Sequence, residues 1–505
     1  MEIFSNFYMA FNIAFEPINL LVCFIGVFIG NLVGVLPGIG TTPAICLLLP
    51  TTLYLTPTQS LIMLAGIYYG AMYGGSITSI LLNIPGEGTS MITCLDGYPM
   101  AKAGRAGPAL GISAFGSFIA GTFSVLMLMI FGPILAGMAL KFGPPEFVAL
   151  TFLGLTLVTY LGSGSMIKAL MMAAFGLLLG CIGLDPISGT ERYTLNIMRL
   201  KDGIGLIPIM MGLFGVAEVF LTIEKSLKKA EIFKTATKEL LPTKQDWKDS
   251  SGAIMRGTIV GFFLGIIPGG GGLLASLMSY AIEKRFSKHP EKFGKGAIEG
   301  VAGPETANNA GAGGSFIPLL TLGIPCNVVM AVLMGALMVH GISPGPLLLK
   351  EHPNLFWGVV GSMYIGNVML LALNLPFIPL WVKILKIPYF LLFPLILLLC
   401  LIGSYSLNNS PWDIGIMIVF GVLGYLMKKF DYPSAPLVMA LVLGPMFEVA
   451  LRQSLIMSNG SLLIFFSRTI SAFIIIISFL ILLSPLGLKL VRKKRPGLLK
   501  KEEDF

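Results

Sequence analysis

Two copies of a Gly-x-x-Pro-Gly-x-Gly pattern interrupt apolar runs of this sequence, one ending at Gly40 and the other at Gly271. Proline lacks the backbone N–H that a helix needs, and glycine weakens a helix interior by about 1 kcal/mol, so each copy predicts a broken helix. The unpaired N–H groups at the start of a half-helix suit carboxylates, whereas freed carbonyl oxygens suit sodium ions. The chemistry expected at these breaks is the binding of an anion, a small cation or both.

Small polar side chains accompany both breaks, and they can hold an anionic ligand without arginines buried in a membrane. Glu87 and Glu305 are the acidic residues beside the breaks, and we expect both to be functional, because ionisable groups at membrane depth usually are. The predicted substrate- or ion-binding residues are Pro37, Gly38, Gly40, Thr41, Asn83, Pro85, Gly86, Glu87, Thr89, Gly269, Gly271, Glu305, Asn308, Asn309, Gly314, Ser315, Pro325 and Asn327. A sodium ion could be held by the backbone carbonyls near 38–40 and 269–271.

The amino-acid composition indicates that these residues belong to a membrane protein. Hydrophobic residues make up 55% of the 505 residues and charged residues only 12%, whereas soluble domains are nearer a quarter charged. Apolar runs of about 17 to 25 residues match the thickness of a bilayer core. The sequence predicts an all-α polytopic integral membrane protein with about 11–13 transmembrane helices. Two short apolar segments, 43–55 and 313–325, are predicted to be re-entrant or broken.

Neither a disulfide framework nor a metal site is predicted. The six cysteines stand singly in apolar stretches without a C-x-x-C pair, and the three histidines do not form an H-E-x-x-H pattern. No catalytic residue and no cofactor is expected.

Lysine and arginine are concentrated in two polar segments, and this predicts the topology. Residues 224–250 form a lysine-rich linker and the C-terminal tail is also basic, while no Lys or Arg precedes Lys102. By the positive-inside rule, the linker and the tail are cytoplasmic and the N-terminus lies outside. The predicted divisions are a first transmembrane repeat (1–223), the basic linker (224–250), a second repeat (251–455), and an extra span with the basic tail (456–505).

The two halves share further short patterns in the same order. Gly74-Gly75-Ser76 corresponds to Gly313-Gly314-Ser315, for example, at an offset of about 240 residues. Ordered matches of this kind indicate an internal duplication. Because the linker and the tail are both predicted inside and one extra span follows the second half, the two repeats must be inverted. An alternative for the Gly-Gly-Ser patterns is that these small residues only let helices pack closely.

Other acidic residues lie near the ends of the predicted spans. They could carry protons or cations, but their positions favour capping or interfacial pairing. These residues are Asp185, Glu191, Glu218, Asp413, Asp431 and Glu448.

Several longer motifs resemble the large membrane subunit of the tripartite tricarboxylate transporters, the TctA family. The resemblance covers about residues 16 to 468. The motifs that carry it are Gly34-Val-Leu-Pro-Gly-Ile-Gly40, Ile67-Tyr-Tyr-Gly-Ala-Met-Tyr-Gly-Gly-Ser76, Asn83-Ile-Pro-Gly-Glu87, Asp96-Gly-Tyr-Pro-Met100, Ile182-Gly-Leu-Asp-Pro186, Gly303-Pro-Glu-Thr-Ala-Asn-Asn309, Ser362-Met-Tyr-Ile-Gly-Asn367 and Leu443-Gly-Pro445.

The resemblance implies a three-part uptake system in a prokaryotic inner membrane. A small membrane subunit of about four spans would accompany this chain, and a periplasmic solute-binding protein would deliver a carboxylate, with citrate as the namesake. The coupling ion would be sodium or a proton, because the sequence contains no nucleotide-binding Gly-x-x-x-x-Gly-Lys-Ser/Thr motif. The positive net charge reflects orientation in the lipid bilayer and implies no nucleic-acid partner.

Three other functions are weighed against a carboxylate carrier. A carboxylate or anion channel would have charge rings or a carbonyl filter and would not need two broken halves. A transporter of a different small solute could use the same fold. An intramembrane enzyme would need a nucleophile or an acid pair, and Ser76 and Ser315 have no histidine nearby in sequence.

Overall fold

The structure is a computed structural model, and it describes residues 2–36, 39–161, 165–224, 241–385 and 389–494. The predicted site residues Pro37 and Gly38 lie outside the described residues, as do most of the basic linker and the end of the tail.

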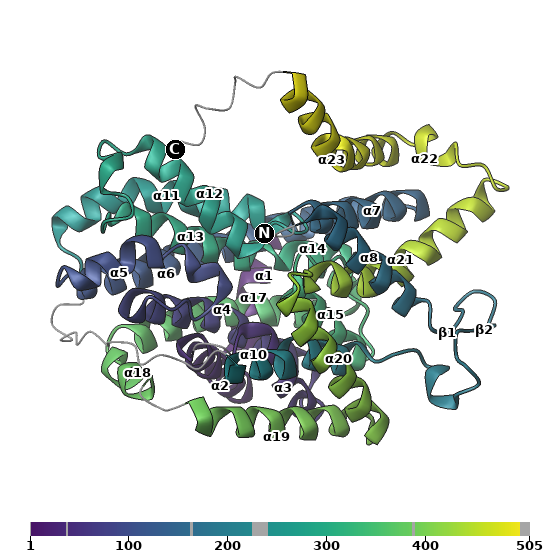
Figure 1. Ribbon diagram of the computed structural model, residues 1–505, viewed down its shortest axis with the longest axis horizontal. Coiled ribbons are helices and arrows are strands. Elements are labelled where there is room, and N and C mark those ends of the chain that lie inside the picture. The colour runs from purple at the N-terminus through teal and green to yellow at the C-terminus, as the bar shows by residue number, and fades with distance from the viewer. Residues whose placement is uncertain (1, 37–38, 162–164, 225–240, 386–388, 495–505) are drawn as a thin grey trace.

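The described chain is almost entirely helical, which confirms the predicted all-α class (Figure 1). One short hairpin, whose strands β1 and β2 have two residues each, projects from one end of the molecule. The elements of the first half are α1 (Glu2–Ala14), α2 (Pro17–Val35), α3 (Thr41–Thr52), α4 (Pro57–Leu82), η1 (Gly88–Met91), α5 (Cys94–Lys102), α6 (Ala106–Ala139), α7 (Pro144–Leu161), α8 (Met166–Gly180), β1 (Gly183–Leu184), β2 (Glu191–Arg192), η2 (Met198–Leu200), α9 (Leu206–Met210), η3 (Met211–Val216, a π-helical turn) and α10 (Ala217–Glu224).

The second half also contains both long and short helices. Its elements are α11 (Lys244–Ile266), α12 (Gly271–Phe286), η5 (Pro290–Lys292), α13 (Glu299–Gly314), α14 (Phe316–Leu322), α15 (Val328–Val339), α16 (Leu348–Glu351), α17 (Pro353–Asn374), α18 (Ile378–Ile384), α19 (Tyr389–Asn408), α20 (Pro411–Lys429), α21 (Ser434–Met457), α22 (Ile464–Ser467) and α23 (Thr469–Lys494).

One helix in each half forms the centre of the molecule. In α4 every residue from 60 to 82 is buried, and in α13 and α14 every residue from 300 to 321 is buried. Both helices carry small residues on several faces, which lets neighbouring helices approach closely on all sides.

Glycines at every fourth position join α2 to α4. Gly26, Gly30 and Gly34 lie on one face of α2, and a Cβ at any of them would overlap backbone atoms of α4. On the other side of this contact, a Cβ at Gly74 would overlap the carbonyl oxygen of Asn31. Gly74 belongs to the first Gly-Gly-Ser pattern, and its contact agrees with the alternative explanation that these small residues let helices pack closely.

The same device joins α11 to α13 in the second half. Gly257, Gly261 and Gly265 face α13, and a Cβ on them would overlap backbone atoms of Gly303, Ala307 and Gly311 respectively. The first glycine of each Gly-x-x-Pro-Gly-x-Gly pattern is therefore a packing residue. Only the residues after it belong to the break.

Helices are exchanged between the two halves. The long helix α6 packs on α13 of the second half, and α17 packs on α4 of the first. In the same way α8 packs against α21, and α20 packs against η3. These matched contacts support an internal duplication, whereas the opposite orientation of the repeats and the proposed divisions of the chain remain predictions.

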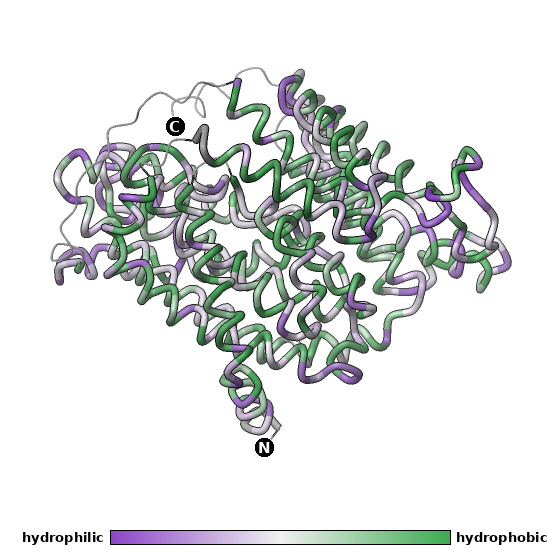
Figure 2. The backbone as a smooth tube through the Cα atoms, turned by 90° about the horizontal axis from the view of Figure 1, so that it is seen from below, coloured by the Kyte–Doolittle hydropathy of each residue, from purple (hydrophilic) through white to green (hydrophobic). Residues whose placement is uncertain are grey.

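Seven described helices are long and apolar enough to cross a membrane by length and composition. They are Pro17–Val35, Ala106–Ala139, Pro144–Leu161, Leu206–Glu224, Pro353–Asn374, Pro411–Lys429 and Ser434–Met457, and four further apolar helices are shorter. Hydrophobic residues colour most of the tube in Figure 2, and hydrophilic residues gather in the loops. A polytopic membrane protein is thus confirmed, while the number of 11–13 spans stays a prediction.

Element boundaries differ from the sequence prediction in two places. Helix α11 begins inside the predicted linker, because Thr243 and Asp246 form a reciprocal capping box at its start. The predicted broken segment 313–325 includes the end of α13 and the short helix α14. Helix α13 itself continues without interruption through Pro304. The other predicted segment, 43–55, lies largely in α3, whose 12 residues are too few to span a bilayer.

Candidate functional site

A cavity of about 340 Å³ lies at the first break. Its walls come from the start of α3, the segment after α4, the π-helical turn η3, and the helices α10 and α20. The lining residues are Ile39, Gly40, Thr41, Thr42, Pro43, Pro85, Gly86, Glu87, Gly88, Phe214, Glu218 and Lys428. Of the predicted site residues, Gly40, Thr41, Pro85, Gly86 and Glu87 meet there.

Left-handed backbone conformations shape both sides of this cavity. Gly40 precedes α3 with φ +75°, where a residue with a side chain would be strained. Asn83 ends α4 with φ 56°, a conformation that asparagine tolerates better than most residues. The side chain of Asn83 is exposed and does not line the cavity, so this predicted residue shapes the turn.

The carboxylate of Glu87 binds the N-terminal end of α3. Its Oε1 accepts a hydrogen bond from the Thr41 backbone N–H at 3.3 Å and another from the Thr41 hydroxyl. Such a position is favourable for an anion, because N–H groups at a helix start are unpaired and carry partial positive charge. The sequence suggested that the start of this half-helix binds a ligand carboxylate. In this conformation the carboxylate of Glu87 occupies that position.

A lysine from the second half reaches the same cavity. Lys428 of α20 forms an ion pair with Glu218 of α10, and both side chains are partly exposed. Sequence reasoning placed Glu218 among the structural acids and missed Lys428. The two residues are 210 positions apart, and no local pattern signals their meeting.

The second break is closed by backbone contacts. Gly269, with φ +79°, donates its N–H to the carbonyl oxygen of Cys326 at 2.8 Å. The thiol of Cys326 in turn approaches the carbonyl oxygen of Ile266 at 3.0 Å. The break after α11 is therefore joined to the loop that contains Pro325, and Gly271 begins α12 just beyond it.

Several predicted residues of the second half have packing or capping roles in this structure. Asn327 caps α15 by accepting the Met330 N–H at 2.9 Å, and it donates to the hydroxyl of Tyr68 in α4 at 3.3 Å. A Cβ on Gly314 would lie 2.7 Å from the carbonyl oxygen of Phe262. The hydroxyl of Ser315 bonds within its own helix, at 2.7 Å from the Ala312 carbonyl. These residues do not line the cavity at Glu87.

A largely buried polar seam joins the halves beside the cavity. We define the seam as Thr89 and Thr93 from the segment after α4, with Glu305 and Asn308 of α13. The Thr93 hydroxyl donates to Glu305 Oε1, and the side chains of Thr89 and Asn308 both crowd the position of a Cβ on Gly272. The seam thus brings three predicted residues, Thr89, Glu305 and Asn308, into one place.

Asn309 lies on another face of α13. Its amide nitrogen donates to the hydroxyl of Ser117 in α6 at 2.8 Å and to the carbonyl oxygen of Glu305 at 3.0 Å. The contact fixes α13 against α6. Asn309 was predicted to bind substrate or an ion, but it does not line the cavity at Glu87.

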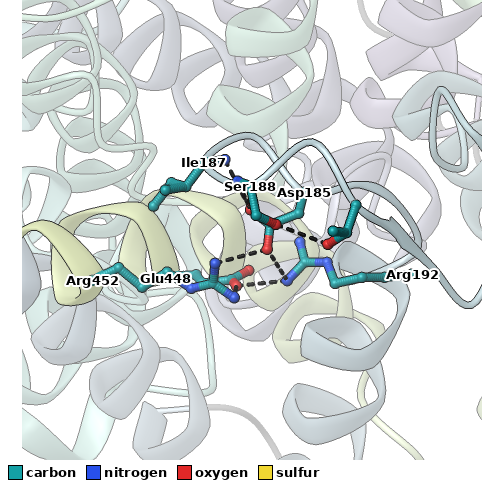
Figure 3. A network of polar contacts seen from close by, with 7 residues as sticks. Asp185, Ile187, Ser188, Arg192, Glu448 and Arg452 are labelled. Carbon is teal, nitrogen blue, oxygen red and sulfur yellow. Dashed lines mark hydrogen bonds and ion pairs between the residues drawn. The ribbon is translucent and has the colours of Figure 1, made fainter.

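Asp185 anchors the loop between α8 and α9 (Figure 3). Its Oδ1 accepts the backbone N–H groups of Ile187 at 2.8 Å and Ser188 at 3.1 Å, and its Oδ2 accepts from Arg452 at 2.7 Å. The two N–H groups and the guanidinium stabilise the carboxylate, so they hold the pKa of Asp185 well below its usual range.

Glu448 completes this network from α21. Arg192 donates to Glu448 at 2.6 Å, and Arg452 pairs with Glu448 at 2.8 Å (Figure 3). The carboxylate beside it raises the pKa of Arg192. The network ties the loop of the first half to a helix of the second. Asp185 and Glu448 each form ion pairs with arginine, as their positions near the span ends led us to expect.

Two larger cavities, of about 530 and 460 Å³, lie along α21. Apolar side chains form most of their walls, for example Phe142, Phe147 and Met446 in the first. Such walls give a carboxylate few polar partners, so the smaller cavity at Glu87 is the better candidate for an anion site.

Fold and site together define a polytopic helical membrane protein with a polar cavity at a broken helix, an arrangement typical of secondary transporters. The comparisons with known proteins agree with this class. The chain belongs to the tripartite tricarboxylate transporter TctA family, which matches residues 20–439, and this confirms the resemblance seen in the sequence.

Relatives with similar sequences occur in Agrobacterium vitis. An uncharacterized 52.8 kDa protein in the TAR-I ttuC' 3' region is 51% identical over 472 residues, which cover 94% of each chain. An uncharacterized protein in the TAR-II ttuC' 3' region is 53% identical over 212 residues, which cover 42% of this chain and 88% of that protein. No solved structure matches the chain.

Proposed function

We propose that the chain is the large translocating subunit of a tripartite, ion-gradient-driven uptake system for tricarboxylates or related small carboxylates. It works in a prokaryotic inner membrane with a small membrane subunit, and a periplasmic binding protein delivers the ligand. Family membership supports this three-part arrangement, because the matched family is named for such transporters.

The observation that carries the proposed carboxylate site is the cavity where α3 begins. It combines the start of a half-helix, the hydroxyl of Thr42 and the ammonium group of Lys428 with Thr41, which is bound to Glu87 in this conformation. A carboxylate ligand would exchange with Glu218 as the partner of Lys428 and would accept a hydrogen bond from Thr42. It would gain the donors of Thr41 only by displacing Glu87 from the start of α3. Charge-assisted bonds of this kind are among the strongest available to a carboxylate.

The same cavity suggests one state of an alternating-access cycle. Glu218 belongs to α10, which ends at Glu224 just before the linker that is predicted to be cytoplasmic. The cavity would then open toward the cytoplasm. Transport requires a second state in which the broken segments expose the site to the other side.

Replacing Lys428 tests this proposal. Lys428→Gln is expected to lower the kcat/KM of carboxylate counterflow in proteoliposomes by about tenfold to a hundredfold, since a charge-assisted hydrogen bond is worth about 1.5–3 kcal/mol. Lys429→Gln is the matched control, because its side chain pairs with Glu224 outside the cavity and should be dispensable. Transport that survives in Lys428→Gln contradicts the proposed site.

The double variant Glu218→Gln/Lys428→Gln separates binding from simple pairing. If Lys428 served only to neutralise Glu218, removing both charges would restore transport. Transport that stays low assigns Lys428 to the ligand. Unsaturable conductance in place of counterflow would indicate a channel and would overturn the carrier assignment.

A further inference from the structure

The polar seam contains unpartnered groups that a bound ligand would satisfy. Glu305 is 1% exposed and Asn308 is fully buried. Within the described part of the chain, Glu305 Oε2 has no hydrogen-bond partner, and neither does the amide oxygen or nitrogen of Asn308. Buried polar atoms without partners are costly, and in native proteins they commonly mark a bound ion, a bound water or a functional site.

The residues with unpartnered atoms lie close together along α13. Glu305 and Asn308 are three residues apart on α13, so their side chains are neighbours on one face of the helix. That face meets Thr93 at the level of Glu305 and Thr89 at the level of Asn308. The buried hydroxyl of Ser113 in α6 lies beside the Glu305 carboxyl, but the two do not have the geometry of a full hydrogen bond.

The charge of this region selects the kind of ligand. Among the described residues, no Lys, Arg or His forms an ion pair with Glu305, so the surrounding atoms offer one carboxylate and several neutral oxygens. A carboxylate ligand would be repelled there. Calcium sites ordinarily collect several carboxylates, whereas a single carboxylate with hydroxyl and amide oxygens balances the charge of one monovalent cation.

We propose that Glu305, Asn308, Thr93 and Ser113 form a sodium-binding site between the two halves. This inference rests on the proposed function, since it names the coupling ion of that transport. It places the ion away from the backbone carbonyls of the Gly-x-x-Pro-Gly-x-Gly breaks, where the sequence suggested it.

The location explains how sodium could act on the carboxylate site. Thr93 and Glu87 belong to the same short segment after α4, and Glu87 holds the start of α3 at the cavity. A cation shared by Thr93 and α13 would fix this segment against the second half. Sodium and carboxylate binding would therefore be coupled, and by linkage each would raise the affinity for the other.

The direct test measures ²²Na⁺ binding to the full-length chain purified with its small membrane subunit. We expect saturable sodium binding. Glu305→Gln and Thr93→Val should each weaken this binding by at least about tenfold. Thr93→Ser keeps the hydroxyl and should retain sodium binding. Thr258→Val is the matched control, because its buried hydroxyl donates to the Ile254 carbonyl oxygen of its own helix, away from Glu305. Binding that is absent in the native protein, or unchanged in Glu305→Gln, overturns the sodium site.

Asn308→Asp distinguishes a cation site from a second carboxylate site. An added negative charge at nearly constant shape should preserve or strengthen ²²Na⁺ binding, whereas it would repel a carboxylate. Loss of ²²Na⁺ binding in Asn308→Asp, with the protein still folded by size-exclusion chromatography, contradicts the inference.

Transport measurements keep the inference separate from the proposed function. Carboxylate counterflow without any sodium binding would leave the transporter standing and overturn the sodium site, as would uptake driven by a pH gradient with sodium absent. Sodium binding that survives in a protein without carboxylate counterflow would support the site and overturn the proposed function.

Discussion

The two glutamates beside the breaks, Glu87 and Glu305, have different surroundings in this molecule. Glu87 lies at a cavity and receives hydrogen bonds from the N–H and hydroxyl of Thr41, so its negative charge is already stabilised by the start of α3. Glu305 is enclosed and has an oxygen without a partner among the described residues. The first therefore organises the broken helix, and the second attracts a cation.

A glycine substitution tests the close packing of the central helices. A Cβ on Gly261 would overlap the carbonyl oxygen of Ala307, so Gly261→Ala forces α11 away from α13. We expect a destabilisation of about 1–3 kcal/mol, the usual cost of overpacking. Thermal unfolding in detergent, followed by size-exclusion fluorescence, measures it.

Gly415→Ala is the control for this substitution. A Cβ at Gly415 meets nothing within 4 Å, so alanine there should leave stability unchanged or raise it slightly, because alanine favours a helix. Equal melting temperatures for the two variants would contradict the packing argument.

At the scale of elements, short segments are fixed by longer helices from the other half. The loop between α8 and α9 is attached to α21 through Asp185, Arg452 and Glu448, and the segment after α4 meets α13 through Thr93 and Glu305. Neither segment is long enough to bury a core of its own. Their positions therefore depend on a few polar contacts made across the molecule.

The attachment of the α8–α9 loop should depend on pH in a defined direction. The pKa of Asp185 is lowered in the folded protein, so its contribution to stability is present above its ordinary pKa and is lost as the pH falls through the lowered value. A fluorescent probe at the exposed Leu195 should keep the same mobility from pH 7 down to about pH 4 and become more mobile only below that.

Substitution of the arginine partner gives the same loosening at neutral pH. Arg452→Ala is expected to raise probe mobility at pH 7, whereas Arg199→Ala, at an exposed arginine of the same loop, should not. A transition centred well above pH 4 would show that Asp185 does not control the loop.

At the scale of the whole molecule, helix exchange makes the two halves interdependent. Each central helix, α4 or α13, packs against a long helix from the opposite half. A movement of one broken segment must therefore be accommodated by both halves. This is the mechanical condition for a cycle in which one site opens alternately to either side.

The predicted orientation is tested by cysteine labelling in a variant without native cysteines. Among the described residues that follow Leu195 and precede the linker, one stretch is long and apolar enough to span a bilayer, Leu206–Glu224. Leu195→Cys should react with an impermeant maleimide added outside, and Lys234→Cys should react only after the membrane is permeabilised. Labelling of both positions from the same side would refute this topology and, with it, the inverted repeats.

The amino-acid sequence by itself determined the membrane class, the positions of the two breaks and the family. These are local properties, because an apolar run, a missing proline N–H and a short motif depend only on neighbouring residues. The sequence also indicated Thr41, Glu87 and Glu305 as residues beside the breaks. It could not show that Gly314 and Ser315 serve helix packing in this conformation.

Only the tertiary structure decided which of these residues meet. Thr93 and Glu305 are 212 positions apart, and Glu218 and Lys428 are 210 apart, yet each pair is in direct contact. Such contacts depend on how the exchanged helices pack, and the packing follows from glycine faces and side-chain shapes distributed over both halves. For that physical reason the cavity with its lysine and the buried seam with its unpartnered oxygens became visible only in three dimensions.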